Sequence, residues 1–312
     1  MKLITARQIA DLKISPALCV DWVRESFSLK HAAQLPPKIS LHPQGTDFFN
    51  TMPCLLPGRF GVKEVSRIQG AVPALSSIEL LYNSVSGDLL AIMDADWITT
   101  MRTGAVAALA TQTFRRKGEL AYGFIGLGNS ARATLLCLLE SEPDRFFQVH
   151  LLRYKDQAES FVERFSSYPN VSFRILDDAP SLVAASDVVI SCVTSADGLF
   201  CEDDRAFREG CTVLPVHTRG FQNCDLFFDK VFGDDTGHLH GFKYFDRFRQ
   251  YGEICDVLSG KIPGRENDRE RILSYNIGIG LHDLVFADKI YAMLKDDAPE
   301  WSFEKDTRKF WI

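Results

Sequence analysis

The sequence predicts an α/β protein with a doubly wound parallel sheet and a second, discontinuous α+β domain. From residue 115 to residue 280, short apolar runs alternate with stretches of helical periodicity, which is typical of a parallel sheet with helices on both faces. Before residue 115, proline-punctuated, strand-like pieces indicate a mixed, largely antiparallel unit. We therefore expect one domain at residues 115–280 and another built from residues 1–114 and 281–312.

The parallel domain begins with an apolar run at residues 120–125 that ends in glycine, followed by helical periodicity over residues 131–139. Residues 187–193 are almost continuously apolar, as is typical of a strand buried on both faces of a sheet. The remaining elements of the series are strands at residues 149–152, 171–175, 211–216 and 230–232 and a helix over residues 156–165.

The first domain is expected to contain strands and the helices that connect it to the second. A helix from Asp96 to about Phe114 should join the two domains, with Gly118 just past its end. Residues 281–294 have the pattern of another helix, which is expected to return to the first domain. The strand-like pieces lie at residues 35–38, 52–53, 60–65, 78–83 and 89–93.

Composition narrows the classes of protein. The 312 residues are 46% hydrophobic, which suffices for two well-filled cores, and the net charge of −6 argues against a nucleic-acid partner and favours a small-molecule ligand. No apolar run of about 18 residues could span a bilayer, and no signal peptide is evident, so we expect no membrane association and a cytoplasmic location. The eight cysteines show no zinc-like spacing, so we expect reduced thiols and no metal site.

The segment Gly126-Leu127-Gly128-Asn129-Ser130-Ala131 fits the pattern G-x-G-x-x-A between a strand and a helix. The first glycine permits a tight turn, the second lets the backbone approach a pyrophosphate, and Ala131 lets the helix pack closely on the strand. Asn129 and Ser130 open the helix whose amino terminus would face the phosphates. The parallel domain is therefore predicted to be a Rossmann-type dinucleotide-binding domain.

The end of the second strand indicates which dinucleotide is preferred. An acidic residue about 20 positions after the glycine loop would read the ribose 2′-hydroxyl of NAD, but this strand ends in Leu152-Arg153-Tyr154-Lys155. Arg153 could stack on adenine and clamp the extra phosphate of NADP, and Lys155 would add a point charge. NADP(H) is favoured, while NAD(H) stays possible if these are only solvated turn cations.

Two cationic residues upstream of the glycine loop are candidate anchors for an anionic substrate. Arg102 could pair bidentately with a carboxylate, or it could merely pair with an acid on its own helix. Lys63 is flanked by Val62 and Val65, and a partly desolvated lysine can exchange protons near neutral pH. The alternative is a surface lysine on an edge strand.

Several motifs also occur in a specific order along the chain. They are Asn50-Thr51-Met52-Pro53, Gly61-Val62-Lys63, Ile98-Thr99-Thr100-Met101-Arg102-Thr103-Gly104-Ala105, the glycine loop, Ile262-Pro263-Gly264-Arg265 and Asn276-Ile277-Gly278-Ile279-Gly280-Leu281-His282-Asp283. Through them the chain resembles the ornithine cyclodeaminase/mu-crystallin family over most of its length.

This resemblance implies a homodimer in which the first domain and the last helix bind substrate and form the dimer interface. It also implies that Lys63 sits beside the reacting α-carbon, that Arg102 holds the substrate carboxylate and that Thr103 lies near the cofactor. Lys38 stands where many members of the family carry an arginine, so a second contact to the carboxylate would come from a point charge instead of a fork.

A second departure follows the fifth strand of the parallel domain. Cyclising deaminases of the family carry an aspartate there, and alignment places Arg219, or Gly220 if the register slips, at that position. Neither can accept a proton from an amine, whereas Arg219 could bind a second carboxylate or another oxygen. His217 could serve as a base or donor because its charge can change near physiological pH, although a histidine at a strand end is commonly structural.

These residues predict an NAD(P)H-dependent oxidoreductase acting on the carbon–nitrogen bond of an α-imino or α-amino acid, such as a ketimine reductase or an amino-acid dehydrogenase. One alternative is ornithine cyclodeaminase, a lyase that recycles its NAD and converts L-ornithine to proline. The other is an NADPH-dependent ligand-binding protein of the mu-crystallin type. The missing aspartate counts against the lyase, and Lys63 with Arg102 favours chemistry over binding alone.

Overall fold

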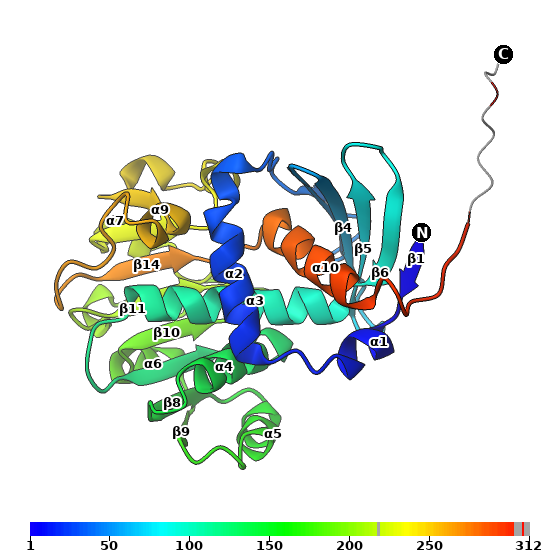
Figure 1. Ribbon diagram of the computed structural model, residues 1–312. Coiled ribbons are helices and arrows are strands. Elements are labelled where there is room, and N and C mark those ends of the chain that lie inside the picture. Colours follow the sequence, from blue (N-terminus) through cyan, green and yellow to red (C-terminus); the bar gives the residue numbers. More distant parts are fainter. Residues whose placement is uncertain (217–218, 303–307, 309–312) are drawn as a thin grey trace.

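The computed structural model describes residues 1–216, 219–302 and 308, and two sheets form its framework (Figure 1). The smaller sheet is mixed: its outermost pair of strands, β1 and β6, is parallel, and the other pairs are antiparallel. In spatial order its strands are β1 (Lys2–Ile4), β6 (Leu89–Asp94), β5 (Leu75–Asn83), β4 (Arg59–Arg67), β3 (Phe48–Leu56) and β2 (Ile39–Leu41). The prediction of a mixed, largely antiparallel unit is confirmed.

The larger sheet is parallel throughout. Its strands, in spatial order, are β13 (Tyr251–Glu253), β12 (Lys230–Gly233), β14 (Ile272–Tyr275), β11 (Thr212–Pro215), β10 (Val188–Ser191), β7 (Ala121–Ile125), β8 (Phe147–Leu152) and β9 (Val171–Leu176). The chain runs outward from β7 to β9 and then returns to β10 on the other side of β7. This reversal defines a doubly wound, Rossmann-type sheet and confirms the predicted fold class.

Helices cover the larger sheet on both faces. On one face, side chains of α4 (Asn129–Ser141) and α5 (Gln157–Arg164) join a core that continues into the first sheet, and on the other face α6 (Ala179–Ala185) joins a separate core. The remaining helical segments are α1 (Ala6–Asp11), α2 (Pro16–Ser28), η1 (Lys30–Ala32), η2 (Asp204–Ala206), α7 (Cys224–Phe227), α8 (Thr236–Leu239), η3 (Phe245–Arg247) and α9 (Ile254–Leu258).

Two long helices connect the sheets. α3 (Asp96–Phe114) runs from one sheet to the other, with the bounds that the sequence predicts (Figure 1). A Cβ atom on Gly104 would lie 2.5 Å from the backbone of Ala133, so the glycine lets α4 pack directly on α3. α10 (Gly280–Leu294) returns to the first sheet and packs on β3, β4 and β5, as expected of residues 281–294. None of the helices in the described residues is long and apolar enough to cross a membrane.

Two parts of the fold differ from the sequence-based prediction. Residues 35–38 form no strand, because Pro36 and Pro37 lack the amide donors of a sheet; the pairing there comes from β2 and from a bridge between Gln34 and Leu55. The sequence reading also missed α2 and β14. β14 inserts between β11 and β12, a place in the sheet that chain order alone does not reveal.

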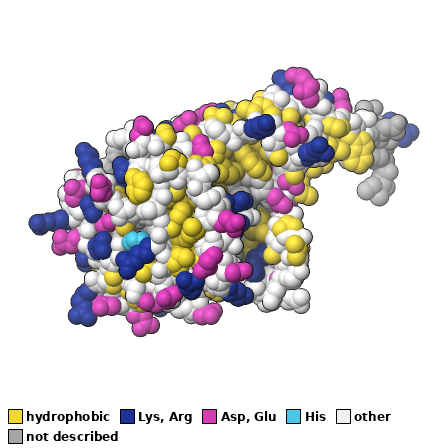
Figure 2. All heavy atoms as spheres, turned by 90° about the horizontal axis from the view of Figure 1, so that it is seen from below, with side chains coloured by type: hydrophobic (Ala, Val, Ile, Leu, Met, Phe, Trp, Pro, Cys, Tyr) yellow, Lys and Arg dark blue, Asp and Glu magenta, His cyan; other side chains and the backbone are white. Residues whose placement is uncertain are grey.

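On the surface, hydrophobic side chains gather in a band across the middle of the face seen in Figure 2, with charges of both signs around it. The smaller sheet also has an uncovered side opposite α10. Its strands place half-buried or exposed apolar side chains there, among them Ile39, Leu41, Phe49, Val62 and Ile78. Thr51, Glu64 and Ser66 lie among them on the same side, and exposed apolar side chains grouped on a sheet face in this way are typical of an interaction surface.

Candidate active site

A cavity of about 260 Å³ lies between the two sheets and collects residues from both. It reaches from the glycine loop and the end of β10 to the ends of β3 and β4. Among the described residues that line it, three are cationic, namely Lys38, Arg67 and Arg102, and none is acidic. A cleft at the carboxyl ends of β7 and β10, where the strand order reverses, is the expected ligand position in a doubly wound sheet.

The glycine loop has the geometry that a dinucleotide needs. Gly126 has a φ of +79°, and a Cβ atom there would lie 2.8 Å from the backbone nitrogen of Val193. Gly128 is the N-cap of α4 without a side-chain capping bond, and no atom lies within 4 Å of where its Cβ would be. The open space and the uncapped helix terminus fit a pyrophosphate bound by backbone amides. Ala131 is fully buried, as close packing of α4 requires.

The nicotinamide end of such a cofactor would enter the cavity itself. Ser130, at the start of α4, and Thr103, on α3, both line the cavity. The Thr103 hydroxyl donates to the carbonyl of Thr99, 2.6 Å away, which fixes its rotamer. Both residues therefore share a cavity with Arg102, and their cofactor-binding roles stay predictions.

The other end of the cofactor site carries charges of both signs. Arg153 follows β8 and is partly exposed, and its Nε donates to Asp177 at 2.9 Å while its NH1 pairs with Glu159. Lys155 is exposed and has a φ of +53°. The sequence reading missed the two acids, because Asp177 lies beyond the next strand. Any ligand phosphate at this position would have to compete with them for Arg153.

A buried ion triad lies at the base of the site. Asp283 Oδ1 accepts hydrogen bonds from Lys63 Nζ at 2.7 Å and from Arg102 Nε at 2.9 Å. All three residues are buried, and Glu79 lies opposite Lys63 on the neighbouring strand β5. Asp283 is in the first turn of α10, where the helix dipole favours a carboxylate. Its place in the Asn276–Asp283 motif was noted in the sequence, but its role as the shared partner was not.

Burial and mutual charge set the protonation states of this cluster. Burial and the nearby Arg102 lower the pKa of Lys63 to about 8, although Asp283 and Glu79 oppose the shift. Burial tends to raise the pKa of Asp283, but Arg102 and Lys63 outweigh it and the pKa is lowered. Burial and Asp283 raise the pKa of Glu79 well above its usual value, although Lys63 and Arg102 oppose this shift.

Arg102 is held by Asp283 and also lines the cavity. Its Nε is held by Asp283, and its terminal nitrogens pack on Gly278, where a Cβ atom would lie 2.3 Å from NH1. Gly278 has a φ of +77° and donates its backbone N–H to Asp234 at 3.0 Å. Asp234 thus holds the loop that keeps the guanidinium in place. Lys63, in contrast, is fully buried and is not among the residues that line the cavity.

Two buried amide oxygens complete the cavity wall. Asn50 Oδ1 and Asn276 Oδ1 both belong to lining residues and have no hydrogen-bond partner within the described part of the chain. The Asn276 amide nitrogen donates to Asp234 at 3.1 Å, which fixes the orientation of this side chain. Free carbonyl oxygens beside cationic side chains suit a ligand that carries both N–H donors and a carboxylate. The sequence reading gave neither asparagine a role.

Lys38 lies at the rim of the same cavity. Its Nζ donates to the carbonyl of Ile277 at 3.1 Å, and burial together with Arg102 lowers its pKa. Arg219 is exposed and lines a different cavity, of about 480 Å³, together with Lys243 and Tyr244. His217 lies outside the described residues. The substrate-binding roles given to Arg219 and His217 therefore stay predictions.

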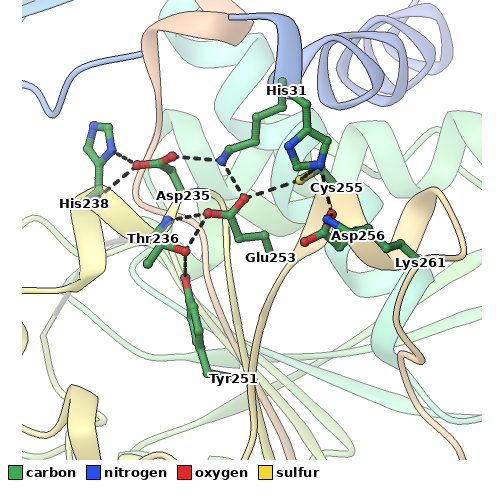
Figure 3. Close-up of polar contacts among 10 residues, drawn as sticks. His31, Asp235, Thr236, His238, Tyr251, Glu253, Cys255, Asp256 and Lys261 are labelled. Atoms are coloured by element: carbon green, nitrogen blue, oxygen red, sulfur yellow. Dashed lines mark hydrogen bonds and ion pairs between the residues drawn. The ribbon is translucent and has the colours of Figure 1, made fainter. Parts of the chain in front are cut away.

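Asp235, His238 and Glu253 belong to a network of polar contacts (Figure 3), and the Lys38 segment is bonded to this network. The Lys38 amide donates to His238 Nε2 at 3.2 Å, so the ring proton is on Nδ1, which donates to Asp235 at 2.7 Å. Asp235 in turn lies 2.9 Å from Lys30 Nζ, which also pairs with Glu253. Lys30 comes from the first domain and both acids from the second, so this network joins the two near the site.

Beside this network the structure brings together His31, Cys255 and Asp256, whose side chains lie close enough to share a metal ion (Figure 3). Asp256 already accepts from His31 at 2.9 Å and from Lys261 at 3.0 Å. Burial raises the pKa of the Cys255 thiol to about 12, which keeps it protonated. The bond from His31 to Asp256 joins η1 to α9.

Fold and site together define a dinucleotide-binding protein of the doubly wound α/β class, with a cavity suited to an anionic ligand. The sequence profile of the ornithine cyclodeaminase/mu-crystallin family matches residues 2–298, and the chain belongs to this family. The resemblance seen in its motifs is thereby confirmed.

Named relatives support the same grouping. Alanine dehydrogenase of Archaeoglobus fulgidus is 26% identical, over 93% of this chain and 94% of the relative. Delta(1)-pyrroline-2-carboxylate reductase of Colwellia psychrerythraea is also 26% identical, over 95% of this chain and 100% of the relative. A solved structure of an archaeal alanine dehydrogenase dimer with bound NAD superposes with a TM-score of 0.84 at 23% identity, covering 97% of this chain and 99% of that one.

Replacing Lys30 by methionine should destabilise the protein. The lysine side chain is 9% exposed, and its removal leaves Asp235 and Glu253, which are 12% and 13% exposed, without their shared cation. Breaking a buried pair in this way costs about 3–5 kcal/mol of unfolding free energy. Lys261→Met, which removes a 63% exposed lysine from Asp256, is the control and should cost at most about 1 kcal/mol. Urea unfolding measures both, and equal losses would contradict the buried role of Lys30.

Proposed function

We propose that this protein is an NAD(P)H-dependent oxidoreductase that acts on the carbon–nitrogen bond of an α-imino or α-amino acid. One observation carries the proposal: a cavity beside the dinucleotide loop presents cationic side chains and free amide oxygens together. A carboxylate would pair with Arg102 and Lys38, while the N–H groups of an imine or amine would donate to Asn276 or Asn50. The family relatives that carry dehydrogenase and reductase names support the same chemistry.

The residues of this chain would position the substrate and manage its charge. Arg102, fixed through Asp283 and Gly278, would hold the carboxylate so that the imine carbon faces the cofactor cleft. A bound nicotinamide supplies the hydride. Lys63, whose pKa is lowered to about 8, would balance the proton that the nitrogen gains when the imine becomes an amine. It would act through its contacts in the buried triad. Positioning and fixed charge are the contributions of the protein, because the cofactor carries the redox chemistry.

The cyclodeaminase alternative has less support. Cyclisation of a diamino acid needs a group that accepts a proton from the terminal amine, and no carboxylate is among the described residues that line the cavity. Three cations in the same cavity would also repel a second ammonium group. The ligand-binding alternative does not explain why the chain buries a lysine, Lys63, whose pKa is lowered toward neutral pH.

The domain division and the dimer belong to the same proposal. We assign residues 1–114 and 281–312 to the substrate side and residues 115–280 to cofactor binding, because α10 brings Asp283 to the first sheet. The uncovered apolar face of that sheet is the surface we assign to a second copy of the chain. The archaeal alanine dehydrogenase is described as a dimer, which supports dimer formation but not a particular face.

Purified protein should oxidise NADPH or NADH when given a cyclic α-imino acid such as Δ1-pyrroline-2-carboxylate. Arg102→Ala should lower kcat/KM by about 100-fold, because it removes the charge-assisted grip on the carboxylate. Arg205→Ala, which removes an exposed arginine paired with Asp203, is the control and should retain full activity. Turnover unaffected by Arg102→Ala, or cofactor binding without any turnover, would contradict the proposal.

The kcat/KM of the reductive reaction should depend on pH through the titration of Lys63. Because the pKa of Lys63 is lowered to about 8, its proton is present below that pH and is lost as the pH rises. The kcat/KM for imine reduction should therefore fall through pH 8, and Lys63→Met should be slow and lack this fall. The readout is the ratio of wild type to variant, since protonation of the substrate affects both proteins equally. A ratio that stays constant from about pH 6 to pH 10 would exclude Lys63 as the titrating group.

The finer proposal for the cofactor is a preference for NADP(H). Arg153 and Lys155 follow β8, which has no acid at its end, and this supports a contact with the 2′-phosphate although Arg153 now pairs with Asp177 and Glu159. The double variant Arg153→Ala with Lys155→Ala should raise the KM for NADPH by about tenfold and change the KM for NADH by less than about twofold. Asp177→Ala, which frees Arg153 from an acid, should act in the opposite direction on NADPH. Equal effects on both cofactors would refute the preference.

A further inference from the structure

We propose that the substrate is a short dicarboxylic α-imino or α-amino acid, and that Arg67 binds its second carboxylate. The inference rests on the proposed function, because it names the substrate class of the same cavity. Arg67 lies outside the family motifs that the sequence contains, and only the folding of the chain brings it to the cavity.

Arg67 is built into the wall of the cavity. It is the last residue of β4 and lies opposite Phe48 of β3, which also lines the cavity. Its NH1 donates to the carbonyl oxygen of Thr46 at 3.2 Å and to the Thr46 hydroxyl at 2.9 Å. These two bonds orient the guanidinium and leave other N–H donors of the fork for a ligand. Among the described residues no carboxylate forms an ion pair with Arg67.

Strand geometry places Arg67 at the far end of the substrate from the triad. Lys63, Val65 and Arg67 alternate along β4, so their side chains leave the same face of the sheet. Lys63 and Arg67 are four residues apart, which is about 13 Å along a strand, and both side chains are long. Val65 lies between them and lines the cavity. A small molecule held at Arg102 can therefore extend past Val65 toward Arg67.

Three cations line the cavity and none of the described lining residues is acidic, while Asp234 and Asp283 offset these cations in part from behind the wall. Arg102 shares Asp283 with Lys63, while Lys38 and Arg67 donate to backbone or hydroxyl oxygens. A substrate with one carboxylate and an alkyl side chain would place that alkyl group against Arg67 and strip water from an unpaired guanidinium, which is unfavourable. A second carboxylate converts the same contact into a charge-assisted pair.

The dimensions of the cavity favour a short diacid. Its volume of about 260 Å³ is below the range of about 300–1,000 Å³ that is typical of drug-sized ligands. The wall between the cations is apolar and suits one or two methylene groups. That wall is formed by Phe48, Met52, Val65 and Leu75.

The reaction balances without any further reagent. The 2-oxo acid and ammonia lose water to form the imino acid. Its imine carbon then accepts a hydride from NAD(P)H and its nitrogen gains one proton when the imine is neutral. The products are the dicarboxylic amino acid and NAD(P)⁺, and the second carboxylate takes no part in the chemistry.

The test compares NAD(P)H oxidation with ammonia and four 2-oxo acids: the diacids oxaloacetate and 2-oxoglutarate, and the monoacids pyruvate and 2-oxobutyrate. The readout is the ratio of kcat/KM for a diacid to that for the monoacid closest in length. We expect the wild-type ratio to exceed about 10, and Arg67→Met to lower it by about 10- to 100-fold, the worth of one charge-assisted contact. Arg67→Lys should restore part of it.

Arg59→Met is the matched control, because Arg59 lies on the same strand but pairs with Asp288 outside the cavity, and its ratio should equal that of the wild type. A wild-type preference for monoacids would overturn this inference and leave the proposed function intact. If the wild-type protein turns over none of these acids and no cyclic imine, the proposed function itself is overturned. An Arg67→Met variant with a raised KM for the cofactor and an unchanged ratio would assign Arg67 to the cofactor, which also overturns the inference.

Discussion

The site depends on one carboxylate that two buried cations share. Asp283 Oδ1 binds Lys63 from β4 and Arg102 from α3, so a single oxygen joins the last helix, the first sheet and the connecting helix. None of these charges could be buried alone, since an unpaired ion in a protein interior is strongly destabilising. The return of α10 to the first sheet is therefore also what places the arginine at the cavity.

A second constraint comes from glycines at close backbone contacts. Gly126 lets the turn after β7 pass beside Val193, and Gly278 lets the Arg102 guanidinium lie directly on the chain. Both have positive φ, and a Cβ atom at either position would occupy space that another group already fills. A glycine with positive φ at a close contact thus positions both the dinucleotide loop and Arg102, on opposite sides of one cleft.

The charge of the cleft is positive because cationic side chains outnumber the acids around it. Asp283 is shared by Lys63 and Arg102, and burial raises the pKa of Glu79 and of Asp234, so the anionic charge around the cleft is smaller than the cationic charge of Lys38, Lys63, Arg67 and Arg102. Asp234 lies behind the cavity wall and offsets part of this charge, while Asp235 and Glu253 are held by Lys30. The cavity therefore has a net positive charge that suits an anionic ligand. At the contact around Lys30, in contrast, the charges of the lysine and the two acids offset one another.

The sequence alone predicts the fold class, the helix at Asp96–Phe114 and the glycine loop, and it singles out Lys63 and Arg102, because periodicity, turn glycines and ordered motifs are local features. It could not show that β14 inserts between β11 and β12, or that Asp283 is the partner of both cations, since these contacts join segments up to 220 residues apart. Nor could it show which cations share a cavity: Arg67 does, while Arg219 lines another. Tertiary structure decided these points, because burial and charge pairing depend on which surfaces the folded chain brings together.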